Sequence, residues 1–260
     1  MFSSKLKSRV LRATLAGAAI WGTAGVAALA APAVVVKSSA SEYPVGSKID
    51  DTAIITLESG DSVTVLTNKG TRTMKGPGTF EVGAKPKSNR ARFANLTRKR
   101  AASRGTTGAV RGTGDTADRP LSPNLYYVDV EQSGTICLYD LEAVRFWRPF
   151  DAGIETYKMA KAVLEPFAGS EVAAEVEKPD PVSIDVTFDD GESLAPLDPA
   201  LLTVEEGTAY EITSPVGGEP AVISFKTLDA DYAQADELAA ALVEKGCMAQ
   251  LELMGEKLGA

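Results

Sequence analysis

Residues 54–82, IITLESGDSVTVLTNKGTRTMKGPGTFEV, carry the clearest structural pattern in the chain. Apolar residues alternate with threonine in two runs, ITL at 55–57 and VTV at 63–65, as in strands with one buried face. The intervening ESGD and NKG segments consist of residues that favour turns, and Gly70 can adopt the positive φ that a hairpin bulge requires. GPG at 76–78 interrupts pairing because proline has no N–H to donate. We therefore expect a small β-meander domain over residues 41–83.

The composition of the 260-residue chain restricts its chemistry. Hydrophobic residues make up 44% and charged residues 24%, as in ordinary globular proteins. The chain contains no histidine, which excludes imidazole bases, Ser-His-Asp or Cys-His machinery and histidine-bound zinc or haem. Its two cysteines are too few for a four-thiolate metal site. We expect no cofactor and no metal.

The first 30 residues have the pattern of a secretory signal peptide. Four bases precede an apolar stretch at 13–30, and they are Lys5, Lys7, Arg9 and Arg12. Small residues at 28–30 suit a signal peptidase, so we predict cleavage after Ala30. The alternative is an uncleaved membrane anchor, since the apolar stretch is near the length that spans a bilayer. Both readings place the remaining chain outside the cytoplasm, in the periplasm or secreted, with no transmembrane span after cleavage.

Residues 84–120 form a basic segment downstream of the meander. Nine bases occur in it without an acidic residue between 84 and 112, and they are Lys85, Lys87, Arg90, Arg92, Arg98, Lys99, Arg100, Arg104 and Arg111. The stretch 101–118 is rich in Gly, Thr and Ser and has too few large apolar residues to offset its ordering entropy. We predict a flexible linker, within which 91–96 suit a short helix or a strand.

The charges of the chain are segregated along the sequence. Residues 171–260 hold 20 Asp and Glu against four lysines. Such segregation indicates either intramolecular docking or two different partners. The nine bases are therefore candidates for binding a polyanion, which outside the cytoplasm means anionic lipid, lipopolysaccharide or surface polysaccharide. The alternative is a solvated linker without a partner.

Residues 121–260 predict a β-sandwich-like domain with one C-terminal helix. Strand patterns occur at 125–130, 135–139, 143–147, 155–159, 182–188, 209–213 and 221–228. A helix is predicted at 231–245, with Asp231 and Gln234 as a capping box and Gly246 at the C-cap. Alternation at 247–254 predicts one more strand.

Two features of this domain concern single residues. Cys137 and Cys247 predict one disulfide in an exported protein, against the alternative of two buried thiols. Trp147 lies between Phe146 and Arg148, which suits either a cation–π pair or a core position with one of the two aromatic residues exposed.

Two resemblances extend this reading. The runs SVTVL at 62–66 and KGPGTFEV at 75–82 resemble the β-rich periplasmic module of FecR-like proteins, although a signal peptide stands where those regulators have a cytoplasmic anti-sigma domain. Together with SGTIC at 133–137, FWRP at 146–149 and GCMAQL at 246–251, these runs also resemble a group of exported alphaproteobacterial β-rich proteins, which implies export but no particular activity.

The sequence thus predicts a mostly β protein, with an N-terminal β-meander plus a β-sandwich-like domain with one C-terminal α-helix. We expect a non-catalytic exported envelope interaction or scaffold module, whose partner is an envelope protein or an anionic envelope surface and not a nucleic acid. The alternative is a carboxylate-based hydrolase of envelope glycans, which requires two carboxylates facing one cleft.

Overall fold

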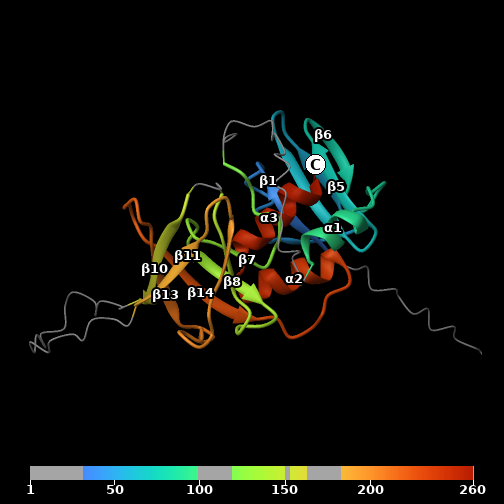
Figure 1. The fold of residues 1–260 in the computed structure, drawn as a ribbon. Helices are drawn as coiled ribbons and strands as arrows, with labels where there is room; N and C mark the ends of the chain where they lie inside the picture. Colours follow the sequence, from blue (N-terminus) through green and yellow to red (C-terminus); the bar gives the residue numbers. More distant parts are fainter. Residues whose placement is uncertain (1–31, 99–118, 150–152, 163–182, 260) are drawn as a thin grey trace, which may run out of the picture.

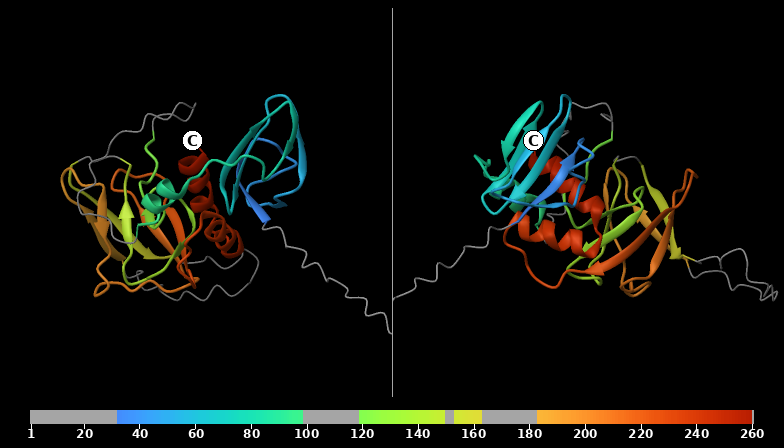
Figure 2. Two further views of the ribbon diagram at one scale, coloured as in Figure 1. Left: turned by 90° about the vertical axis from the view of Figure 1, so that its right-hand side faces the viewer. Right: turned by 180° about the vertical axis from the view of Figure 1, so that it is seen from behind.

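The computed structural model describes residues 32–98, 119–149, 153–162 and 183–259. These residues form two β-sheet bodies with a layer of helices between them (Figure 1), and the side view in Figure 2 separates the three parts. The fold is mostly β with helices near the C-terminus, as predicted.

The N-terminal body contains a four-stranded sheet in the order β2-β1-β4-β5 and a two-stranded sheet of β3 and β6. Its strands are β1 (Pro32–Ser38), β2 (Lys48–Asp50), β3 (Ile54–Leu57), β4 (Ser62–Thr67), β5 (Gly70–Lys75) and β6 (Gly78–Glu81). All its strand pairs are antiparallel. A core that includes Val35, Ile55, Val65 and Met74 lies within this body.

The C-terminal body consists of a five-stranded sheet, β11-β10-β13-β14-β8, and a three-stranded sheet, β12-β9-β7. Its strands are β7 (Tyr127–Asp129), β8 (Gly134–Leu138), β9 (Arg145–Trp147), β10 (Glu155–Lys161), β11 (Ser183–Phe188), β12 (Leu194–Pro196), β13 (Ala209–Thr213) and β14 (Ala221–Thr227). Both sheets contribute to one apolar core, in which Phe146, Met159, Tyr210 and Phe225 are fully buried.

Three helices lie between the two bodies. Their apolar side chains form a third core together with residues of both bodies. The helices are α1 (Arg90–Leu96), α2 (Ala235–Lys245) and α3 (Met248–Gly259). This core joins Val36 and Leu66 of the N-terminal body to Phe93 of α1 and to Leu242 and Met254 of α2 and α3. The helices therefore belong to both bodies, and the predicted domain boundary at 121 divides residues that pack together.

Strand β1 is buried on both faces, and its sequence explains why. Successive side chains of a strand point to opposite faces. Val34 and Val36 enter the core beneath the helices, whereas Ala33 and Val35 enter the core of the N-terminal body. The uninterrupted apolar run AVVV is typical of such a strand, which alternation alone does not detect.

The N-terminal body differs from a simple meander. Strands β4 and β5 form the predicted hairpin, and Gly70 has the expected positive φ of 140°. Strand β6, however, pairs with β3 instead of β5, and β4 pairs with β1. The GPG segment at 76–78 thus redirects the chain to another sheet.

The predicted strand at 247–254 is wrong, because these residues belong to helix α3. The buried side chains at Leu251, Met254 and Leu258 recur every three or four residues, the helical period that extends beyond the short window in which alternation is visible. Helix α2 begins at Ala235 and not at 231; its N-cap, Gln234, makes no side-chain cap hydrogen bond. The predicted C-cap at Gly246 is confirmed by its φ of 76°.

The first part of the predicted linker, residues 84–98, is folded in the structure, and the short helix that residues 91–96 suit is present as α1. Helix α1 buries Phe93 and Leu96 in the helix-layer core, and Lys87 pairs with Thr71 at the edge of β5. The flexible-linker prediction is therefore wrong for residues 84–98, where two large apolar side chains were enough to dock a short helix. Residues 99–118 lie outside the described part of the chain.

Candidate functional site

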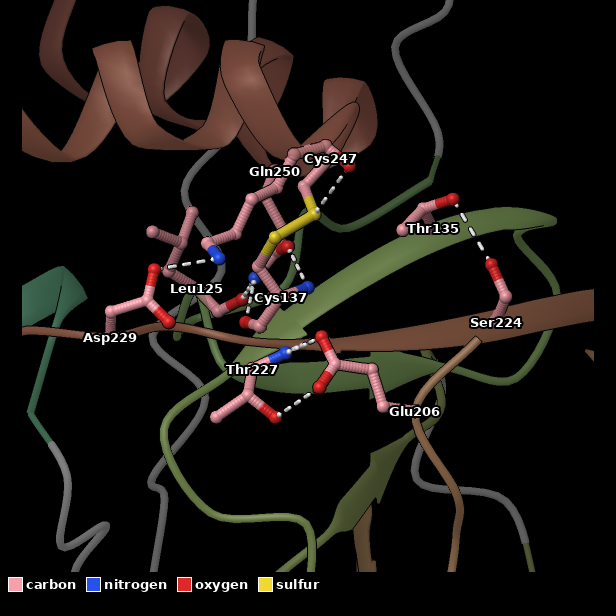
Figure 3. The surroundings of a disulfide bond; sticks show 10 residues. Leu125, Thr135, Cys137, Glu206, Ser224, Thr227, Asp229, Cys247 and Gln250 are labelled. Carbon is pink, nitrogen blue, oxygen red and sulfur yellow. Dashed lines mark hydrogen bonds and ion pairs between the residues drawn. A yellow bond between two sulfur atoms is a disulfide. The ribbon is translucent and has the colours of Figure 1, made fainter. Parts of the chain in front are cut away.

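The predicted disulfide is confirmed. Cys137 on β8 and Cys247 between α2 and α3 are bonded, with their Cα atoms 5.9 Å apart and 110 residues apart in sequence. Figure 3 shows the bond connecting the strand to the start of α3. It fastens the helix layer to the edge of the five-stranded sheet, and both cysteines are fully buried.

Gln250 completes this junction from the first turn of α3. Its Nε2 donates to the carbonyl oxygens of Leu125 and Cys137 at 2.8 and 2.9 Å, and its Oε1 accepts from the Cys137 N–H at 2.6 Å. The side-chain amide thus pairs with the open edge of β8 as a neighbouring strand would (Figure 3). Gln250 is 3% exposed, so these three backbone groups are satisfied away from water.

Five of the nine predicted polyanion-binding bases fall within the described residues. Lys85, Lys87, Arg90, Arg92 and Arg98, here named the basic strap, are all exposed. Among the described residues, no ion pair involves Lys85, Lys87, Arg90 or Arg98, so none of these four bases is paired with an acidic residue of 183–259. The other four candidates, Lys99, Arg100, Arg104 and Arg111, lie outside the described residues, as does the predicted signal peptide at 1–30.

The basic strap rests on a fixed support. The backbone N–H and C=O of Lys87 both pair with Thr71, at 2.7 and 2.9 Å, and the Asn89 amide donates to the Thr71 hydroxyl at 2.7 Å. Lys69, at the tip of the β4–β5 hairpin, lines the same small polar hollow as Arg90. Sequence reasoning missed Lys69 because it precedes the basic segment and joins it only through the strand pairing.

A larger cavity of about 310 Å³ lies where β1, α3 and the segment before β7 meet. Its apolar lining comes from Val36, Val45, Leu121, Ala249 and Leu253. Its polar lining comes from Lys37, Ser38, Arg119, Ser122, Asp129, Gln132, Glu252 and Glu256. The volume is at the lower end of the range for small-molecule sites.

Two ion pairs account for most of the charge in this cavity. Lys37 Nζ lies 2.6 Å from Glu256 Oε1, and Arg119 lies 2.6 Å from Asp129 and 3.2 Å from Glu131. Burial alone would lower the pKa of Arg119, but its hydrogen bonds and charge interactions with Asp129 and Glu131 outweigh burial and raise that pKa. Glu252 is the one lining carboxylate outside these pairs among the described residues.

Lys257 lies next to the cavity wall. Its ammonium donates to the carbonyl oxygen of Leu121 at 3.3 Å. Burial lowers the pKa of Lys257, because a desolvated ammonium is less stable than a hydrated one.

Trp147 occupies a core position, as one of the two interpretations predicts, but the exposed aromatic neighbour in that interpretation is wrong. Phe146 and Trp147 are both buried, and β9 has a sheet neighbour on each side. Arg119 lies over the Trp147 ring, and Arg148 lies over Phe188 at 5.0 Å instead of over Trp147. Arg148 is 1% exposed; it pairs with Glu155 at 2.9 Å and donates to the carbonyls of Gly153, Asp189 and Glu192.

The described residues contain neither a metal-binding cluster of acidic, cysteine or histidine side chains nor a membrane-spanning helix. Residues 32–98, 119–149, 153–162 and 183–259 contain no group of three Asp, Glu, Cys or His side chains placed to hold a metal ion. None of the helices in this part of the chain is both long and apolar enough to span a bilayer.

The chain matches no protein-family model, no curated protein and no solved structure. The basic strap and the cavity are the two candidate binding sites of the described residues. A sequence signal for the cavity existed in Glu252 and Glu256, which are four residues apart and share one face of a helix. That signal was lost when residues 247–254 were interpreted as a strand.

Proposed function

We propose that the protein is a non-catalytic exported module that attaches to an anionic envelope surface through its basic strap. Export is supported by the disulfide between the only two cysteines, because such bonds persist in oxidising compartments. We retain the predicted signal peptide at 1–30 and the periplasmic or secreted location as parts of this proposal.

The proposal rests on the exposure of the bases in the basic strap and on their ordered support. Four exposed bases without an ion pair among the described residues are held by a docked helix and a backbone bridge. Bases on an ordered support lose less conformational entropy on binding than bases on a free chain. Each base near an anionic bilayer contributes about 1 kcal/mol, so four suffice for reversible attachment.

The C-terminal body opposes this attachment. Residues 183–259 hold 16 Asp and Glu against three lysines, so the same surface repels this part of the molecule. We therefore expect weak binding that depends strongly on salt, because exposed charges are screened within about 10 Å at 0.1 M salt.

The test is co-sedimentation of the mature protein with vesicles of phosphatidylglycerol and phosphatidylcholine at low and moderate salt. The variant Lys87→Glu/Arg90→Glu reverses two strap charges, and Lys48→Glu/Lys75→Glu makes the same change of net charge elsewhere in the N-terminal body. We expect at least tenfold weaker binding for the strap variant, because each reversal removes an attraction of about 1 kcal/mol and adds a repulsion.

Arg90→Glu is compatible with folding, since an acid in the first turn of α1 suits the helix dipole. Absence of binding at low salt would refute the proposal, as would an equal loss in both variants. The alternative of a carboxylate-based hydrolase gains no support from the cavity, where Asp129 and Glu256 are each paired with a base.

A further inference from the structure

We propose that the cavity between β1, α3 and the segment before β7 binds an alkylammonium or alkylguanidinium group. The group is either a free amine or the side chain of a lysine or arginine in a partner. This inference is independent of the basic strap and of its anionic surface.

The shape and lining of the cavity suit a short apolar stem. Leu121 is 46% exposed. Together with Val45 and Leu253 it contributes an apolar lining to the 310 Å³ cavity. A stem of four or five carbons would remove this apolar lining from water, which favours binding.

The charge of the cavity selects a cation. Lys37 and Arg119 are each committed to a carboxylate, at 2.6 Å in both pairs. Glu252 remains, one turn before Glu256 on the same face of α3, and it has no hydrogen bond or ion pair among the described residues. An ammonium or guanidinium group would neutralise Glu252 and leave both existing pairs intact.

Gln132 provides a second polar contact. Gln132 is an exposed residue that lines the cavity, and its side chain has no hydrogen-bond partner among the described residues. Its amide oxygen can accept an N–H from the same cation that pairs with Glu252. An anionic ligand, by contrast, would have to approach Glu252 or break one of the two ion pairs.

The walls of the cavity come from both bodies. Lys37 and Val45 belong to the N-terminal body, Gln132 precedes β8, and Glu252 lies on α3. A bound cation would contact all three parts of the molecule. Binding should therefore also stabilise the relative placement of the two bodies.

The experiment is an NMR titration of the full mature protein at low salt with three probes that each contain five carbons: n-pentylammonium, 1-pentanol and pentanoate. We expect pentylammonium to shift resonances around Glu252 with a Kd on the order of 1 mM, as suits a ligand of six heavy atoms. The alcohol should bind more weakly and pentanoate most weakly. Raising the salt should weaken only the ammonium probe.

Two matched variants test the charge. Glu252→Gln keeps the size of the side chain and removes its charge, and it should weaken pentylammonium binding about fivefold, as for an exposed ion pair. Glu244→Gln removes one charge from an exposed position on α2 and should leave binding unchanged. Leu121→Ser should weaken pentylammonium and pentanol together, because it removes part of the apolar lining.

The source of the group is distinguished by a further probe, N-acetyl-lysine-N-methylamide. Tighter binding of this probe than of pentylammonium indicates a side chain in a partner, and the reverse order indicates a free amine. Equal binding of the three five-carbon probes, or equal effects of the two Gln variants, would overturn the proposal. Binding that occurs only after Lys99, Arg100, Arg104 and Arg111 are replaced by Gln would also overturn it, because the occupant would then be the chain itself.

Discussion

Replacing Gln250 with methionine tests the junction between α3 and the edge of β8. Methionine is close to glutamine in size and fills the same buried space, but it offers neither the donors nor the acceptor of the amide. The change leaves the N–H and C=O of Cys137 and the C=O of Leu125 without their partner. The disulfide one turn away remains in place and keeps the strand beside the helix.

The structure sets the size of the effect. A buried backbone group that loses its partner costs about 1–3 kcal/mol. Three such groups, with some local relaxation of α3, predict a loss of about 3–5 kcal/mol in the free energy of unfolding. Domains are stable by about 5–15 kcal/mol, so the variant should still fold.

The assay is urea unfolding of the oxidised protein, followed by circular dichroism. The midpoint should fall by more than about 1 M urea if the m-value is in the usual range. Glu252→Met serves as the control, since it places the same residue on the exposed side of α3 and should change the stability by less than about 0.5 kcal/mol. A loss below about 1 kcal/mol for Gln250→Met would show that the amide does not act as a substitute strand.

Four further changes test other parts of the fold by the same unfolding assay. Cys247→Ala should lower the free energy of unfolding by about 4–5 kcal/mol, because the lost bond closes a loop of 110 residues. The near-UV circular dichroism of both bodies should disappear in one transition, whereas two independent domains would give two transitions. Arg148→Met should cost about 3–5 kcal/mol, since it leaves a partly buried carboxylate and three carbonyls without their donor; a neutral result would mean that the guanidinium is dispensable. Gly255→Ala should destabilise the protein by at least about 1 kcal/mol, because a Cβ there would overlap the carbonyl oxygen of Val36, whereas an unchanged midpoint would show that α3 can move away from β1. Asp236→Asn should stabilise the protein at pH 7. Burial raises the pKa of Asp236 above 3.8, so ionisation of this carboxyl favours the unfolded chain as the pH rises through the folded pKa. The gain should vanish below about pH 3.8, where the carboxyl is protonated in both states.

The positions of most strands follow from local sequence. The predicted strand at 182–188 corresponds to β11 (Ser183–Phe188), and that at 209–213 coincides with β13. In both, one face is buried and the other exposed, so the alternation in the sequence directly reports the environment. The disulfide was likewise predictable, because two cysteines in an exported chain allow only one pairing.

The partners of the strands do not follow from local sequence. Strands β7 and β8 follow each other in the chain, yet β7 pairs with β9 and β8 with β14, both in parallel. A parallel pair needs a long connection. The partner of β7 lies 18 residues further along the chain and that of β8 lies 89 residues further along, and nothing in β7 or β8 themselves indicates either segment. Helix α3 was missed for a related reason, since its buried face contains Gln250, a polar residue whose partners are on β8 and before β7.

Apart from the spacing of Glu252 and Glu256, the sequence does not indicate the cavity, because its walls are brought together only by the helix layer. Lys37 and Glu256 are 219 residues apart in sequence, and the strand and helix that carry them meet where Gly255 lets α3 approach the backbone of β1. The same close approach buries Val36 against Met254, so the ion pair and the apolar core depend on one contact. A ligand in the cavity would strengthen that contact, and loss of the Cys137–Cys247 bond would weaken it from the opposite end of α3. The basic strap is tied to this layer through Phe93 and Leu96. The two proposed binding surfaces therefore depend on the same packed layer. If this layer opens as one unit, reduction of the disulfide should abolish amine binding and vesicle binding together. Loss of one before the other would show that the layer opens in parts.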